Sequence, residues 1–158
     1  MSGPSDHGAA ALDLLARKAD AARSDPERTE AALAEALRLA PEDLDVRLGA
    51  YRFYFYNHRY EQALVHCEAL IGHAARRLNV AIDWRDVGPG DAAFTEVAFA
   101  PGLYLQALLA WGYCHLRLGR HAPAREALSH SARLDPTDRF GAAVILGYLN
   151  DREMGGEV

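Results

Sequence analysis

Apolar residues recur at helical spacing through the first part of the chain. In residues 8–23 and 27–40 they fall on one helix face each, at Leu12, Leu15, Ala19, Leu33, Ala36, Leu37 and Leu39. Between the two segments, Asp25 can cap the second helix and Pro26 suits its first turn, where a missing N–H costs little. Pro41 ends that helix. The pattern predicts two helices joined by a short break.

The same pattern continues to the other end. Helices are predicted over residues 44–57 and 60–77, because the intervening Asn57, His58 and Arg59 favour a turn. Two more helices are predicted between residues 101 and 136, joined at residues 119–121 and closed by Pro136. Their close approach is expected at the small residues Gly112, Ala124 and Ser131. A last apolar helix is expected over residues 138–151.

Two local motifs resemble the tetratricopeptide repeat (TPR), a helix–turn–helix unit of about 34 residues. The motif Leu108-x-x-Trp111-Gly112-x-x-His115 is similar to the opening of a TPR first helix, and residues 60–64, Tyr-Glu-Gln-Ala-Leu, are similar to that of a second helix. The middle unit departs from this pattern, since Arg47-x-x-Ala50-Tyr51-x-x-Tyr54 lacks the glycine. The resemblance implies a protein-binding scaffold and names no partner.

The spacing of matched positions indicates an insertion before the last unit. Two pairs of matched positions were compared, Ala63 with Ala124 and Pro41 with Pro136. Each pair is separated by a whole number of repeats plus about 27 residues. The predicted fold is therefore an all-α, TPR-like α-solenoid of about three helical hairpins plus a C-terminal capping helix. We expect a flexible leader (1–7), one helical domain (8–150) and a tail (151–158). The domain would consist of three repeats (8–42, 43–77 and 104–138), the insertion (78–103) and the capping helix (139–150).

The insertion has a composition of its own. Residues 79–91 lack a sustained helical period and contain the breaker Gly88-Pro89-Gly90. Its apolar residues favour burial over disorder; they are Val80, Ile82, Trp84, Phe94 and Phe99. Two roles remain open: the insertion folds back over the groove or the hairpin ends, or it docks a partner, with Trp84 as a loop contact.

The resemblance to TPR arrays also implies a concave groove lined by the first helices of successive units. Its partner-binding positions would be Leu48, Arg52, Phe55, Tyr56, Gln106, Leu109, Tyr113, Leu116 and Arg117. Aromatic residues and Arg are enriched where interfaces concentrate their binding energy. The alternative is that Phe55, Tyr56 and Tyr113 pack under the insertion or the N-terminal helix, because each loses apolar area from water by doing so. Leu48 and Arg52 replace two residues of the Lys and Asn set that holds acidic chaperone tails, which argues against such a ligand.

Composition narrows the function classes. The net charge of −5 over 158 residues argues against nucleic-acid and anionic-membrane partners, which need a concentrated basic surface. The start of the chain lacks the pattern of a secretory signal, and no run reaches the length of a membrane span. Two cysteines are too few for a disulfide framework, so the cytoplasm is the expected compartment.

Candidate chemistry is sparse. Metal or Cys/His chemistry is suggested only by the neighbours His66-Cys67 and Cys114-His115, which point about 100° apart on a helix and do not chelate together. Both cysteines are expected on core faces, and His121 is expected to fill the turn position that aligns with Tyr60. We therefore expect no enzyme activity, cofactor or metal, and a role as an adaptor or as an assembly or chaperone-like accessory factor that binds a protein or peptide. The alternatives are a small enzyme or metal carrier on a TPR scaffold and a self-associating (homo-oligomeric) structural module.

Overall fold

The computed structural model describes residues 25–155, and the regular secondary structure in this part of the chain is all helical, with no strand. The predicted all-α class is confirmed. The helices are α2 (Pro26–Leu39), α3 (Leu44–Tyr56), α4 (Tyr60–Leu78), α5 (Phe99–Arg117), α6 (His121–Leu134) and α7 (Ala142–Gly155), with a single 3₁₀ turn, η1 (Trp84–Asp86), between α4 and α5. The chain divides into two compact units, residues 1–57 and 58–158, which we describe separately. The single domain over 8–150 stays a prediction.

In the first unit, aspartates begin both described helices. The carboxylate of Asp25 accepts a hydrogen bond from the backbone N–H of Arg28 (3.2 Å), and that of Asp43 accepts one from Val46 (3.0 Å). These bonds satisfy donors that have no partner within the helix. Helices α2 and α3 pack on each other around a core of Ala36, Ala40 and Val46.

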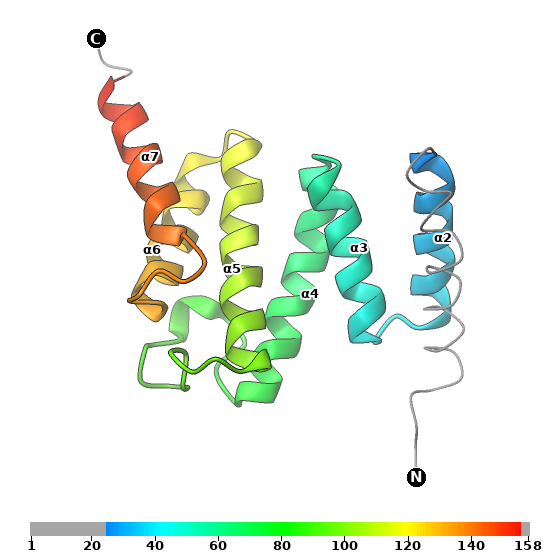
Figure 1. Ribbon diagram of the computed structural model, residues 1–158, viewed down its shortest axis with the longest axis horizontal. Coiled ribbons are helices and arrows are strands. Elements are labelled where there is room, and N and C mark those ends of the chain that lie inside the picture. Colours follow the sequence, from blue (N-terminus) through cyan, green and yellow to red (C-terminus); the bar gives the residue numbers. More distant parts are fainter. Residues whose placement is uncertain (1–24, 156–158) are drawn as a thin grey trace. The chain divides into compact units, whose positions relative to one another are not determined.

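In the second unit, consecutive helices are neighbours in space. Helix α5 packs against both α4 and α6, and α7 packs on α6 (Figure 1). The face of α5 that points into this unit is fully buried at Tyr104, Leu105, Leu108 and Cys114. Among the described helices, none is long and apolar enough to cross a membrane.

The contact between α5 and α6 depends on a glycine. A Cβ atom at Gly112 would lie 3.1 Å from Cγ of Leu128, 3.2 Å from Cβ of Ala127 and 3.4 Å from the carbonyl oxygen of Ala124. Ala124 and Ser131 are also buried on the facing side of α6. The close approach expected at Gly112 and Ala124 is therefore present, since even a Cβ atom at 112 would be packed more tightly against α6 than in ordinary van der Waals contact.

Two helices begin elsewhere than expected. Helix α5 starts at Phe99, five residues before the predicted repeat boundary, because Pro101 and Gly102 lie within its first turns, where the N–H that proline lacks has no helical partner. Helix α7 starts at Ala142, later than the predicted residue 138, because Asp138 (φ 52°) and Gly141 (φ 89°) adopt the left-handed conformation. The part of the insertion that lies outside the α-helices is therefore residues 79–98, which include the 3₁₀ turn η1.

The insertion folds back onto α5 and α6 of its own unit. Of the apolar residues expected to favour burial, Trp84 and Phe94 are buried (6% and 2% exposed), as is Val87 (1%), whereas Ile82 (71%) and Phe99 (54%) are exposed. The Trp84 ring lies edge-on to Trp111 of α5 (centroids 5.6 Å apart) and to His130 of α6 (5.4 Å). Of the two roles left open, this packing matches the folded-back one.

Three polar contacts hold the insertion in place. Nε2–H of His130 donates to the carbonyl oxygen of Val87 (2.6 Å), and Nη2 of Arg139 donates to that of Phe94 (2.8 Å). On the surface, Arg85 pairs with Glu126 of α6 (2.7 Å). The two backbone carbonyls are thus satisfied by side chains, as buried polar groups require.

The expected leader (1–7) and helix 8–23 lie outside the described residues, as do residues 156–158 of the tail. The expected middle hairpin, residues 44–57 with 60–77, spans the boundary between the two units, so its helices α3 and α4 are described each in its own unit. The solenoid arrangement therefore stays a prediction.

Candidate functional site

The nine residues expected to line a groove share one property: none is buried. Four of them, Leu48, Arg52, Phe55 and Tyr56, lie on α3 in the first unit, and the other five, Gln106, Leu109, Tyr113, Leu116 and Arg117, lie on α5 in the second. In α5 they occupy the face opposite the core residues. Because the two sets belong to different units, a single groove containing both stays a prediction.

The α3 set belongs to an aromatic surface. The ring of Phe55 packs against Tyr51 (centroids 5.4 Å apart) and lies edge-on to Tyr56 (5.6 Å). Tyr56 is 71% exposed, which is unusual for so large an apolar ring. The aromatic rings of this helix therefore contact one another while leaving apolar area open to solvent.

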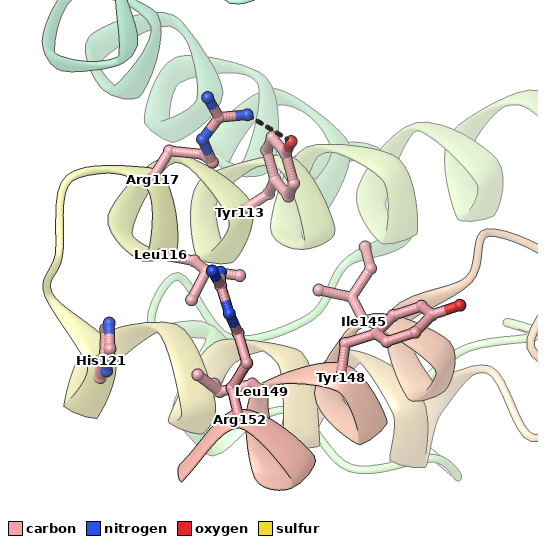
Figure 2. A pocket seen from close by; sticks show the side chains of 8 residues that line it. All are labelled: Tyr113, Leu116, Arg117, His121, Ile145, Tyr148, Leu149 and Arg152. Atoms are coloured by element: carbon pink, nitrogen blue, oxygen red, sulfur yellow. Dashed lines mark hydrogen bonds between the residues drawn. The ribbon is translucent and has the colours of Figure 1, made fainter. Parts of the chain in front are cut away.

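The α5 set borders a cleft within the second unit. The cleft has a volume of about 870 Å³ and lies between the C-terminal half of α5, the first residue of α6 and one face of α7 (Figure 2). Its lining residues are Tyr113, Leu116, Arg117, His121, Ile145, Tyr148, Leu149 and Arg152. This is the size range of pockets that enclose small ligands or several side chains of a partner.

Three of the predicted residues, Tyr113, Leu116 and Arg117, meet in this cleft, whereas Gln106 and Leu109 lie nearer the start of α5 and do not line it. The sequence reasoning missed the four residues from α7. Ile145, Tyr148, Leu149 and Arg152 are spaced i, i+3, i+4 and i+7, which places them on one helix face. That spacing is a usable signal of a shared face, whereas the capping role predicted for this helix gives no reason to expect a cleft there.

His121 also differs from its expected role. It is the first residue of α6 and is exposed, and its ring lines the cleft. It follows Gly119, whose φ of 79° makes the tight turn between α5 and α6. The turn itself is therefore formed by the glycine, and His121 contributes to the cleft wall.

Arg117 is held in position by tyrosines. Its Nη1 donates a hydrogen bond to the hydroxyl oxygen of Tyr113 (3.0 Å; Figure 2). Its guanidinium carbon lies 5.2 Å from the ring centroid of Tyr60 and 5.8 Å from that of Tyr113. These are cation–π distances, so the two tyrosines hold the guanidinium in one orientation.

The charged residues that line the cleft are all basic. None of its eight lining residues is acidic. Elsewhere in this unit arginines pair with carboxylates, as Arg120 does with Glu61 and Arg85 with Glu126. Within the described residues, Arg117 and Arg152 form no ion pair with a carboxylate.

Trp84 does not fit the expected role of a loop contact for a partner. Only 6% of it is exposed, and the guanidinium of Arg85 covers its ring at 4.3 Å. Burial of a ring of this size against Trp111 and His130 removes a large apolar area from water. Trp84 is therefore a packing residue that fixes the insertion on its unit.

The cysteines occupy core positions, as expected. Cys67 of α4 and Cys114 of α5 are both free thiols with no exposed area. A hydrogen bond with the Cys114 thiol, together with burial, raises the pKa of Cys67 well above its usual range. Within residues 25–155, no cluster of three or more His, Cys, Asp or Glu side chains is arranged to hold a metal ion.

The chain is similar in sequence to a known protein. Over 125 residues the chain is 39% identical to the uncharacterized 19.8 kDa protein in the nifW 5′ region of Azotobacter chroococcum mcd 1. The matched segment covers 76% of this chain and 68% of the relative. No family model matches the chain. No solved structure matches it either.

Proposed function

Because the chain belongs to the same family as the 19.8 kDa Azotobacter chroococcum protein, we propose one function for both: a protein-binding module that acts as an adaptor or assembly factor. A segment of the partner would bind in the cleft between α5 and α7. On this proposal the fold is a TPR-like stack, and α7 serves as one wall of the binding cleft.

One observation carries the proposal. Tyr113, Leu116 and Arg117, chosen from the sequence as groove positions, border a cleft of about 870 Å³ together with an apolar and aromatic face of α7. Tyr148 of that face is 70% exposed, and Val144 on the same helix is 57% exposed. Exposed large apolar residues beside a cleft are typical of interaction sites.

The experiment compares two substitutions at exposed apolar residues of one unit. Tyr148→Asp places a charge in the cleft, and Val65→Asp places the same charge on α4, where Val65 is 59% exposed and does not line the cleft. Both side chains are exposed, so both variants should fold, which circular dichroism would verify. The tagged full-length wild type and both variants are used to capture proteins from the native host.

We expect Tyr148→Asp to lose a partner that the wild type and Val65→Asp both retain. A partner set that is identical for all three proteins would overturn the assignment of the cleft. The gene position of the relative makes the nifW product the first purified protein to test for direct binding, in the same three-way comparison.

A further inference from the structure

The cleft has an electrostatic character opposite to that of the whole chain. The net charge of the protein is −5, yet the cleft contains Arg117, Arg152 and His121 and no acidic residue. Figure 2 shows Arg152 reaching from α7 toward Leu116 of α5. Two guanidinium groups without carboxylate partners in the described part of the chain favour a ligand that supplies carboxylates.

The walls between these charges are apolar. Leu116 of α5 and Ile145 of α7 are half-buried, and Leu149 of α7 is 4% exposed. Such side chains gain from contact with apolar side chains of a partner, at about 25 cal/mol for each Å² removed from water. The matching ligand therefore has an apolar face bordered by acids.

The shape of the cleft favours a helix as the ligand. Helices α5 and α7 both pack on α6, and the α7 wall runs from Ile145 to Arg152, which is about 10 Å or two helical turns. The walls are helices, whose backbone groups bond within the helix, so they offer no free edge with which an extended strand could pair. A partner helix satisfies its own backbone and can bury its apolar face in the cleft.

We propose that this cleft binds an acidic amphipathic helix of a partner protein. Apolar residues at positions i, i+3 or i+4, and i+7 of that helix would contact Leu116, Ile145 and Leu149. Flanking Asp or Glu side chains would pair with Arg117 and Arg152. This inference rests on the proposed function and adds the chemistry and conformation of the segment that is bound.

The test uses displayed peptides rather than an unknown partner. A library of Ala-rich helical peptides with one randomised face is selected on full-length wild-type protein, and the enriched peptides are synthesised with fluorescein labels. We expect an excess of Asp and Glu beside large apolar residues at helical spacing. Replacing the acids of an enriched peptide by Gln or Asn should weaken its binding, and the difference should shrink as salt is added.

Matched variants locate the contact. Arg117→Gln and Arg152→Gln should each weaken binding of the enriched peptides about two- to fivefold, as expected for exposed ion pairs at low salt. Arg133→Gln removes an exposed charge from α6 outside the cleft and should leave binding unchanged. Tyr148→Asp should abolish most of the binding, because its carboxylate repels the acids of the peptide.

Three results would overturn the inference: no enrichment over a Tyr148→Asp selection, enriched peptides without an excess of acids or helical spacing, or equal binding by wild type and both Arg variants. The proposed function fails on a different result, the retention of every captured partner by Tyr148→Asp. A partner lost by Tyr148→Asp but bound equally by the two Arg→Gln variants would preserve the adaptor function and reject the acidic ligand.

Discussion

The indole rings of Trp84 and Trp111 meet edge to face, with centroids 5.6 Å apart and an interplanar angle of 62°. Trp84 comes from the insertion and Trp111 from the middle of α5. The indole N–H of Trp111 donates to Glu68 of α4 (3.2 Å), so this pair links the insertion to two helices of the unit. The contact therefore fixes the long insertion between α4 and α5 on the second unit.

Removal of this ring should destabilise the second unit. Trp84→Ala leaves a cavity against Trp111 and His130, and we expect a loss of about 3–5 kcal/mol in the free energy of unfolding. Chemical denaturation followed by circular dichroism measures it. The control is Ile82→Ala in the same segment, where a side chain that is 71% exposed should contribute little. Equal stability of the two variants would mean that the insertion is not packed as described.

Gly112 should not tolerate a large side chain. Gly112→Leu would collide with Ala124, Ala127 and Leu128 across the α5–α6 contact, and overpacking of this kind costs about 1–3 kcal/mol. The control is Gly72→Ala in α4, where the nearest atom is the flexible Nη1 of Arg76 at 3.5 Å. That change should stabilise the helix by about 0.5–1 kcal/mol. A thermal unfolding midpoint for Gly112→Leu at or above that of the wild type would contradict the close approach.

Acid should weaken the contact between the insertion and α6. Burial lowers the pKa of His130 in the folded protein, and the nearby charge of Arg133 lowers it further. The hydrogen bond to the Val87 carbonyl and the charges of Glu126 and Asp83 raise the pKa, but by less. The unfolded chain therefore binds a proton first, near its ordinary pKa of about 6.5. The stability that neutral His130 contributes is complete above that pH and decreases as the pH falls below it.

A conservative variant isolates this effect. The side-chain amide of His130→Gln can still donate to the Val87 carbonyl but does not titrate. Urea unfolding of both proteins between about pH 8 and about pH 5.5 should show a larger loss of stability for the wild type. Burial lowers the pKa of His115 as well, so some loss should remain in the variant. Parallel pH profiles would assign the acid sensitivity to other groups.

Both thiols should be unreactive in the folded protein. Cys67 and Cys114 have no exposed area, so a reagent cannot reach them, and the hydrogen bond with Cys114 together with burial raises the pKa of Cys67, so Cys67 forms little thiolate near neutral pH. A thiol-specific disulfide reagent should detect no thiol in native protein and 2 in denaturant. Rapid labelling without denaturant would show that the α4–α5 contact opens readily.

The helices themselves were determined by local sequence. Asp25-Pro26, Asp43 and Gly119 are signals that act within one turn, since a cap, a fixed φ or a left-handed residue changes the backbone beside it. The start of α7 was misplaced because Asp138 adopts a left-handed conformation that non-glycine residues rarely adopt. Local signals therefore predicted that the helices exist and erred at their ends.

The cleft was decided only by the tertiary structure. The resemblance to TPR first helices implied Tyr113, Leu116 and Arg117 as groove positions, and none of the three is buried in the structure. It gave no indication that Ile145, Tyr148 and Arg152 would lie opposite them, because that depends on how α7 packs on α6. The burial of Trp84 is of the same kind: its partners Trp111 and His130 are distant in sequence, and only the packed helices bring the three rings together.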